Sequence, residues 1–229
     1  MSVITISRQF GSGGDEIAAS ICKLTGYKLF DKQLLTLAAF ESGMADQEVV
    51  DFCEDNFRGK NFFERLFGGS RPVAQARIWK EGVDGVRMME EEPLNEDRAL
   101  GCVQQAVRKA YQIGDYVIVG RGGQVLLKDL PAVLHVRVIA PLEDRLLRVR
   151  NSPVMAGRKF ADSVEARRAA QELIEKHDEA SAGYLKRFYG MDWADPELYH
   201  LVINTGKQPV ETAARPVIEA AQALQPVAT

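Results

Sequence analysis

The chain has 229 residues, of which 46% are hydrophobic and 27% are charged, and its formal net charge is −3 at pH 7. This composition is typical of a globular protein with a sizeable core, and the negative balance argues against broad electrostatic binding of nucleic acid. No apolar run is long enough to cross a membrane, the opening segment does not resemble a signal peptide, and the three cysteines show no paired spacing. We therefore expect a cytoplasmic protein.

Residues 3–18 carry the first chemical signature. A β-branched run, Val3–Ile6, leads into Gly11-Ser12-Gly13-Gly14, and a helical pattern follows. A strand, a glycine turn and a helix N-terminus together form an anion site, because glycines let phosphate oxygens approach the backbone and the first N–H groups of the helix point at them. The complete phosphate-loop signature also needs a Lys followed by Ser or Thr. This chain has Gly14-Asp15-Glu16 there, so an ordinary strand-to-helix turn stays an equal alternative.

The segments after the first helix are less regular. Residues 27–30 are predicted as a short strand that ends at Asp31, and residues 33–40 resume a helical pattern. Residues 40–95 are predicted as a helical insertion, whose basic side chains form either a solvated face or one wall of a substrate cleft. A clear amphipathic helix follows over residues 100–111.

A second informative stretch begins at residue 116. Residues 116–119 form a continuous apolar run, typical of a strand buried on both faces of a parallel sheet. The run leads directly into Gly120-Arg121-Gly122-Gly123, which predicts a guanidinium at the carboxyl edge of the sheet. The fork of donors in Arg121 suits a phosphate, and an ordinary surface arginine in a loop is the alternative.

Basic residues gather after the next predicted strand, residues 133–138. They lie in a helical segment and in the loop that follows it, as Arg145, Arg148, Arg150 and Arg158. The loop over residues 151–160 contains Pro153 and Gly157, so it either closes over phosphates or serves as an ordinary linker.

The remaining segments are a long helix over about 163–180, a last strand over 199–204 and a last helix over 210–224. Strands that alternate with helices predict a parallel sheet with helices on both faces. The three histidines have no second ligand at metal-binding spacing, so we expect them to be structural.

Three blocks of the sequence resemble the cytidylate kinase-like proteins, bacterial relatives of cytidylate kinase among the P-loop nucleoside monophosphate kinases. The blocks are ITISRQFGSGGDEIA with YKLFDK, VIVGRGG at 117–123, and the run from EKHD at 175–178 through FYGMDW to LVIN. The resemblance covers nearly the whole chain. It implies an α/β, three-layer P-loop kinase fold in one domain over 1–229, with a core over 1–39 and 96–229, a helical acceptor-binding insertion over about 40–95, and an Arg-rich lid over about 150–162.

The resemblance also implies a role for individual residues. The donor phosphates of ATP would be held by Gly11, Ser12, Gly13, Gly14, Asp15 and Glu16. The acceptor would be bound by Asp31, Arg121 and Asp178. The charge of the transferred group would be neutralised by Arg145, Arg148, Arg150 and Arg158.

The chain departs from the cytidylate kinase pattern at the residues that bear most directly on catalysis. Gly14 stands at the position of the phosphate-loop Lys, and Gly122 stands at the position of the carboxylate in the Gly-Arg-Asp motif. Glu179-Ala180-Ser181 replaces nucleotide-binding arginines. We expect Arg8 to supply the missing cation. Asp15 either ligates Mg²⁺ or stabilises the positive end of the helix dipole.

Three hypotheses follow from these residues. The first is an ATP- and Mg²⁺-dependent kinase that phosphorylates CMP or dCMP. The second is a nucleotide-binding protein that has kept the fold and lost the chemistry, and the third is a kinase for another small phosphorylated or hydroxylated acceptor. We expect small nucleotides as partners, and neither nucleic acid nor membrane. The sequence leaves base preference, physiological partner and oligomeric state open, a homodimer included.

Overall fold

The computed structural model describes residues 2–30, 74–81, 87–94 and 96–224, with side chains described over 2–30 and 100–224. The chain forms two compact units, one of residues 1–30 with 113–229 and the other of residues 31–112. The first unit contains the main sheet and the described residues of the candidate site, so its architecture comes first.

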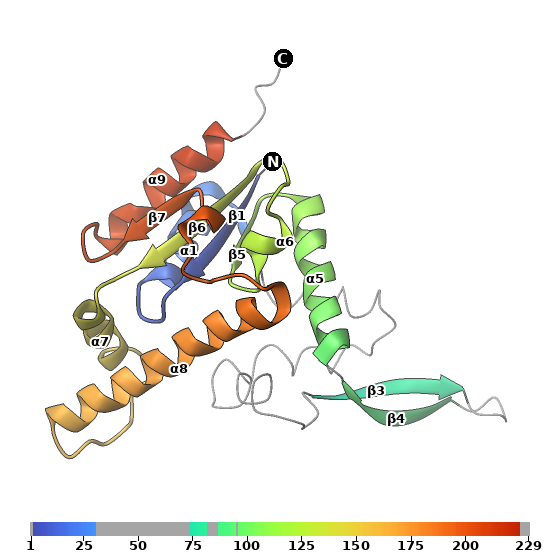
Figure 1. The fold of residues 1–229 in the computed structure, drawn as a ribbon, viewed down its shortest axis with the longest axis horizontal. Helices are drawn as coiled ribbons and strands as arrows, with labels where there is room; N and C mark the ends of the chain where they lie inside the picture. Colours follow the sequence, from blue (N-terminus) through green and yellow to red (C-terminus); the bar gives the residue numbers. More distant parts are fainter. Residues whose placement is uncertain (1, 31–73, 82–86, 95, 225–229) are drawn as a thin grey trace. The chain divides into compact units, whose positions relative to one another are not determined.

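A five-stranded parallel sheet forms the centre of the first unit (Figure 1). Its strands are β1 (Val3–Arg8), β2 (Lys28–Leu29), β5 (Tyr116–Val119), β6 (Val133–Ile139) and β7 (Leu201–Asn204), in the order β2-β5-β1-β6-β7. The central strand β1 pairs in parallel with β5 and with β6. Parallel strands place their carboxyl ends at one edge, which brings the segments after β1, β5, β6 and β7 together there.

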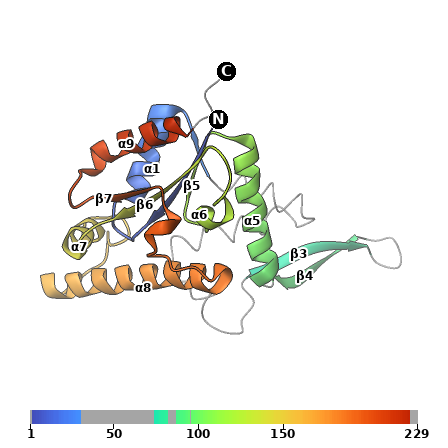
Figure 2. The same cartoon turned by 45° about the horizontal axis from the view of Figure 1, so that its top comes forward.

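Helices cover both faces of this sheet. They are α1 (Gly14–Thr25), α6 (Gly123–Leu126), α7 (Leu142–Arg150), α8 (Ser163–Tyr189) and α9 (Val210–Ala223). The α1 and α9 helices lie side by side (Figure 2) and bury a core in which Ile4 and Ile6 of β1 meet Ile17 of α1 and Val217 of α9. Because side chains alternate along a strand, Thr5 faces the other side, where the α-carbon of Gly123 in α6 packs against it.

The second unit contains an antiparallel hairpin where helices were predicted. Strands β3 (Ala74–Glu81) and β4 (Arg87–Leu94) pair over their full length, so the prediction of a helical insertion over about 40–95 is wrong for these residues. The register places Arg77 opposite Glu91 and Glu81 opposite Arg87. Glu and Lys are depleted in strands, so the composition of these residues does not predict a hairpin. The α5 helix (Glu96–Ile113) follows. Asp31 and the predicted helix over 33–40 lie outside the described residues.

The α8 helix is longer than the predicted 163–180. Its N-terminus is capped by Asp162, which accepts hydrogen bonds from the N–H groups of Val164 and Glu165. It continues to Tyr189, where Gly190 ends it with a φ of 67°. Buried Leu185 packs with Trp193 and Leu198, and this tertiary contact outweighs the weak helix propensity of the Ser-Ala-Gly sequence before it. None of the described helices combines the length and the apolarity that a membrane span requires.

Candidate phosphate-binding site

The turn between β1 and α1 has the backbone of an anion site. Gly11 and Gly13 adopt left-handed conformations, with φ values of 78° and 85°. Gly13 is the N-cap of α1 and makes no side-chain capping bond, and the first N–H groups of a helix, here those of Gly14, Asp15 and Glu16, have no intrahelical acceptor. These N–H groups and the positive end of the helix dipole together favour a phosphate at this turn.

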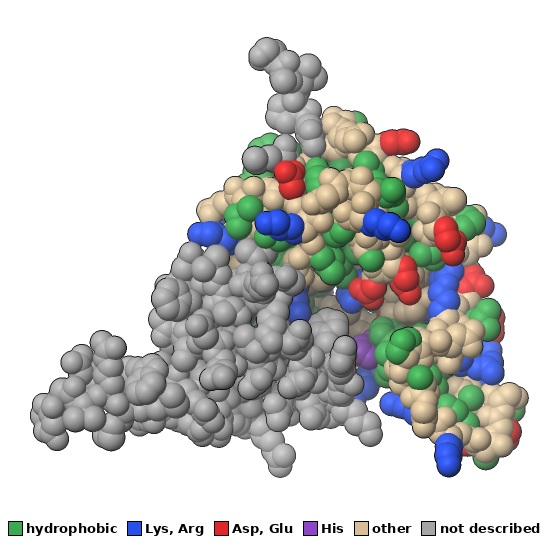
Figure 3. Space-filling view, turned by 180° about the vertical axis from the view of Figure 1, so that it is seen from behind, with side chains coloured by type: hydrophobic (Ala, Val, Ile, Leu, Met, Phe, Trp, Pro, Cys, Tyr) green, Lys and Arg blue, Asp and Glu red, His purple; other side chains and the backbone are tan. Residues whose placement is uncertain are grey.

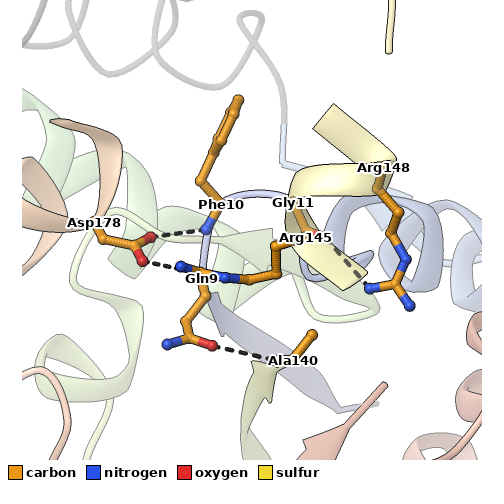
Figure 4. Close-up of polar contacts among 7 residues, drawn as sticks. All are labelled: Gln9, Phe10, Gly11, Ala140, Arg145, Arg148 and Asp178. Atoms are coloured by element: carbon orange, nitrogen blue, oxygen red, sulfur yellow. Dashed lines mark hydrogen bonds and ion pairs between the residues drawn. The ribbon is translucent and has the colours of Figure 1, made fainter. Parts of the chain in front are cut away.

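Contacts with three distant segments of the chain hold the turn in place (Figure 4). The N–H of Phe10 donates to Asp178 Oδ1 at 2.9 Å, and Arg148 Nη1 donates to the carbonyl oxygen of Gly11 at 3.3 Å. Gln9 Oε1 accepts a hydrogen bond from the N–H of Ala140 at 3.1 Å. Because α8, α7 and the segment after β6 each make one of these contacts, the turn is preorganised before any ligand binds.

Asp178 is held in turn by Arg145. Arg145 Nη1 donates to Asp178 Oδ2 at 2.5 Å, and the two side chains are 8% and 19% exposed. A charge-assisted pair with so little exposure fixes both side chains. Arg145 was predicted to neutralise the transferred phosphoryl group, and Asp178 was predicted to bind the acceptor. The structure places both beside the glycine turn, with the carboxylate shared between Arg145 and the backbone of Phe10.

An apolar contact adds to this attachment. The ring of Phe10 stacks on the imidazole of His177, with centroids 4.1 Å apart and an interplanar angle of 8°. Burial, followed by the charge of Arg8, lowers the pKa of His177, and Asp178 acts in the opposite direction. A lowered pKa favours the neutral form of His177.

Thr205, directly after β7, completes the support of the turn. Its Oγ1 donates to the carbonyl oxygen of Ser12 at 2.7 Å, and it accepts from Arg148 Nη1 at 2.9 Å. Arg148 Nη2 also donates to the carbonyl oxygen of Thr205 at 3.1 Å. Sequence reasoning missed Thr205 and Gln9. Their signal was their place directly after a strand, at the carboxyl edge of the sheet.

Arg8 occupies the space that a side chain at residue 14 would need. A Cβ on Gly14 would lie 2.6 Å from Arg8 Cβ and 2.9 Å from Arg8 Cγ. Arg8 Nε donates to Asp15 Oδ1 at 3.0 Å, and Arg8 Nη1 lies 3.3 Å from the point that a Cβ on Gly120 would occupy. The Arg8 side chain therefore runs from the N-terminus of α1 to the end of β5, and it cannot coexist in this position with a lysine at residue 14.

Arg121 lies in a turn of unusual backbone conformation. Gly120, Arg121 and Gly122 all have positive φ values, 70°, 61° and 69°. A Cβ on Gly122 would lie 2.8 Å from the ring of Tyr189, so this position has no room for the carboxylate of a Gly-Arg-Asp motif unless the ring moves. Burial and Tyr189 raise the pKa of Tyr184, and the charge of Arg121 opposes this rise. Arg121 thus lies beside α8, and a non-glycine residue at positive φ is a conformation found at functional sites.

The remaining predicted arginines and carboxylates are exposed. Arg150 ends α7, and Arg158 lies in the loop between α7 and α8, where its Nη1 is 3.9 Å from the sulfur of Met155. Asp15 and Glu16 face solvent in the first turn of α1. Figure 3 shows Lys, Arg, Asp, Glu and His side chains on this face of the described surface.

Within the described ranges, no three His, Cys, Asp or Glu side chains gather in a way that could hold a metal ion. Mg²⁺ in kinase sites is commonly bound by one or two carboxylates together with substrate phosphates, however. Asp15 and Glu16, exposed at the N-terminus of α1, fit this partial donor set, although Asp15 is paired with Arg8.

Comparison with known proteins agrees with this geometry. The profile of the cytidylate kinase-like family matches residues 3–207. No curated protein matches the chain. Among solved structures, an uncharacterized protein from Eubacterium ventriosum ATCC 27560 is similar over 97% of this chain and 99% of its own, with a TM-score of 0.62 and 20% identity. Lower scores are found for shikimate kinases from Acinetobacter baumannii (TM-score 0.44, 13% identity, 97% and 94% covered) and Bacteroides thetaiotaomicron (0.47, 12%, 96% and 98%).

The predicted fold class is confirmed as the α/β fold of the P-loop kinases, with a parallel sheet between helices and a glycine turn after the central strand. The profile covers most of the chain, including the glycine turn, Arg121 and Asp178. The chain therefore belongs to the cytidylate kinase-like family, and this membership supports a nucleotide kinase at the level of the family.

Proposed function

We propose that this protein transfers the γ-phosphoryl group of ATP to CMP, dCMP or a related small acceptor. The observation that carries the proposal is the position of Arg8, whose stem crosses Gly14 and whose guanidinium lies at the N-terminus of α1. Phosphoryl transfer depends on positioning and on neutralising charge. Because the glycine turn of this chain lacks the phosphate-loop Lys, the site needs another cation beside the turn. Arg8 supplies it from the end of β1.

The donor and acceptor would bind at the same edge of the sheet. The glycine turn and Arg8 would hold the donor phosphates, and Arg121, at the end of the neighbouring strand β5, would bind the acceptor phosphate. Asp31, next to β2, would orient the acceptor. Mg²⁺, held by Asp15 with the donor phosphates, would offset their negative charge. A single preorganised donor is worth about 2.7–4 kcal/mol in comparable sites, so Arg8 accounts for about 100- to 1000-fold in rate.

The basic residues of the lid would complete the site. Arg150 and Arg158 are both exposed, unlike Arg145 and Arg148, whose donors are engaged with Asp178, Gly11 and Thr205. We assign the neutralisation of the transferred group to Arg150 and Arg158, and the holding of the turn to Arg145 and Arg148. Closure of the lid over the phosphates would exclude water and prevent hydrolysis of ATP.

A coupled assay tests the proposal. The protein is incubated with excess ATP and Mg²⁺ and a panel of monophosphates that includes CMP, dCMP, UMP and AMP, and ADP release is followed. We expect turnover with at least one cytidine monophosphate and a rate reduced about 100-fold or more in Arg8→Ala. Absence of turnover with every member of the panel and with shikimate-like hydroxylated acceptors would remove the kinase assignment.

A second candidate function is nucleotide binding without turnover, and two observations favour it. The positive charge of Arg8 is already paired with Asp15, and the space beside Gly122 is taken by Tyr189. Calorimetry separates the two functions. Tight ATP binding in a protein that shows no turnover with any acceptor would establish a binding protein.

A further inference from the structure

A second arginine lies buried on the other side of β1 from Arg8. Arg137 of β6 is the register partner of Ser7, and it is only 5% exposed. Its Nη1 donates to the carbonyl oxygen of Trp193 at 2.6 Å, to Tyr199 Oη at 3.3 Å and to Ser7 Oγ at 3.4 Å. Its guanidinium carbon lies 4.2 Å from the centroid of the Trp193 ring and 5.4 Å from that of Tyr199. The aromatic rings and Ser7 therefore fix one end of the guanidinium.

The charge of Arg137 has no acidic partner within the part of the chain that the structure describes. Buried Arg145, by contrast, pairs with Asp178. Burial of an unpaired ion is costly, and a cation–π contact offsets only part of that cost. The hydrogen bonds to neutral oxygens reduce the cost further but leave the net charge in place. An anion is the natural counterpart of such a group.

The free edge of the guanidinium has the geometry that an oxyanion requires. Every hydrogen bond from Arg137 to a described residue leaves from Nη1. The Nε and Nη2 donors form the other edge of the fork, and two parallel N–H donors on one edge match a phosphate or a carboxylate. Neither atom is bonded to a described residue, so this edge is the part of the guanidinium that is left for a ligand.

The position of Arg137 relates it to the acceptor side of the site. Ser7 immediately precedes Arg8, and Trp193 Nε1 donates to Ser7 Oγ at 2.8 Å. Gln124 Nε2, in the helix directly after the Arg121 turn, lies 3.5 Å from Tyr199 Oη. These contacts connect the Arg137 cluster both to the strand that carries Arg8 and to the segment that carries Arg121.

We propose that Arg137, held by Trp193, Tyr199 and Ser7, binds an oxyanion through its Nε/Nη2 edge. The oxyanion is the phosphate or the carboxylate of the acceptor substrate. The assignment to the acceptor rests on the proposed kinase function, whereas the anion site itself does not.

Trp193 provides a reporter for this site. The chain has two tryptophans, Trp79 and Trp193, so a Trp79→Phe background leaves Trp193 as the single tryptophan, whose emission can be excited apart from that of the tyrosines. This protein is titrated with inorganic phosphate, with acetate and with CMP at constant ionic strength. We expect a saturable change in Trp193 fluorescence with phosphate and CMP if the site takes a phosphate, or with acetate if it takes a carboxylate. Absence of any saturable response to all three ligands would overturn the proposal.

Two variants separate this site from the glycine turn. Arg137→Met should weaken the Trp193 response at least about tenfold, whereas Arg8→Ala, which removes the cation of the turn, should leave it in place. If folded Arg137→Met binds the anion as tightly as its parent, Arg137 only fastens the Trp193 segment and the proposal is wrong. If Arg137→Met does not fold, Arg137→Lys replaces it, since a point charge lacks the fork and should bind about tenfold more weakly; equal binding by Arg137→Lys would be contrary to the proposal.

The outcome is independent of the kinase assay. A saturable response that depends on Arg137, in a protein without turnover, would establish the anion site and refute only the kinase. Turnover together with a response that Arg137→Met leaves intact would support the kinase and refute the anion site.

Discussion

Asp178, near the middle of α8, accepts a hydrogen bond at 2.9 Å from the backbone N–H of Phe10, which lies 168 positions earlier in the chain. This single contact joins the glycine turn between β1 and α1 to the distant helix α8. The Arg145 guanidinium holds the other oxygen of the same carboxylate. The conformation of the turn is thus determined by tertiary contacts as well as by its own glycines.

The Asp178→Asn variant tests this attachment. Loss of the carboxylate charge leaves Arg145 buried without its counterion, and breaking such a pair costs about 3–5 kcal/mol when both groups are buried. We expect a loss of stability on the order of 3 kcal/mol in urea unfolding and a higher KM for ATP, with the KM for the acceptor little changed. A rise confined to the acceptor KM would instead support the predicted acceptor-binding role of Asp178.

A matched control lies on the same helix. Glu172 pairs with Arg168 at 3.4 Å, and both side chains are largely exposed. Removal of an exposed i, i+4 pair changes stability by about 0.3–0.5 kcal/mol. Glu172→Gln should therefore unfold almost as the parent protein does.

Arg8 and Gly14 should behave as one functional unit. A methyl group at residue 14 would lie within 3 Å of two Arg8 carbon atoms, so Gly14→Ala should displace Arg8 and reduce kcat/KM about as strongly as Arg8→Ala, by about 100-fold or more. Gly101→Ala is the control, because a Cβ at that position meets no other atom within 4 Å. Equal activity of Gly14→Ala and its parent would show that Arg8 is not the cation of the site.

An exchange of the two positions gives a sharper test. Gly14→Lys alone should be inactive, because its stem collides with Arg8. The double variant Arg8→Ala/Gly14→Lys removes the collision and restores a cation, and we expect it to recover at least about tenfold in kcat/KM over either single variant. Purely additive losses, measured as a double-mutant cycle in the coupled assay, would contradict the idea that the two residues compete for one place.

The lowered pKa of His135 predicts how the free energy of unfolding depends on pH. Burial, and then the charge of His200, lowers the pKa of His135 from 6.5 to about 4, and its Nδ1 lies 2.7 Å from Thr5 Oγ1. Between these two values the unfolded chain binds a proton that the folded protein excludes, so the stability present above pH 6.5 is lost as the pH falls toward 4. The loss is on the order of 3 kcal/mol.

The His135→Asn variant isolates this contribution. Its free energy of unfolding, measured at several pH values in urea, should fall less steeply than that of the parent between pH 6.5 and pH 4. Parallel curves for the two proteins would assign the acid sensitivity to other groups.

The lid assignment predicts a loss of rate without a loss of stability. Arg158 is exposed, and its contact with the sulfur of Met155, at 3.9 Å, is weak. Arg158→Gln should therefore lower kcat by about 10-fold or more and leave the unfolding transition unchanged. Arg168→Gln, on the exposed face of α8, is the control for a general effect of removing positive charge. Unchanged kcat in Arg158→Gln would exclude this residue from the lid function.

The main sheet was predictable because the local sequence of its strands indicates them. Residues 116–119 form a continuous apolar run, residues 133–138 place four apolar side chains around His135 and Arg137, and Gly26 ends α1 in the left-handed conformation that favours glycine. The glycine turn followed from the same local reasoning. The hairpin of β3 and β4 did not, because its strands carry Arg, Lys and three consecutive Glu residues, and its stability depends on cross-strand register.

The roles of the arginines were the hardest part of the site to predict. Arg145 and Arg158 have the same side chain and lie 13 positions apart in the sequence, yet one is 6% exposed and paired whereas the other faces solvent. The difference depends on Asp178, 33 positions beyond Arg145, and no spacing rule reaches that far. The contact between Arg8 and Gly14 likewise depends on how the chain turns after β1.

The contact between Arg8 and Gly14 also constrains how this sequence can evolve. A lineage that carries arginine at the end of β1 cannot acquire lysine at residue 14 in one step, since the intermediate has two cations and room for one. The two positions should therefore change together among descendants, and a lysine at residue 14 requires prior loss of the arginine. Because each residue excludes the other, a chain that has Arg8 tends to keep both Arg8 and Gly14.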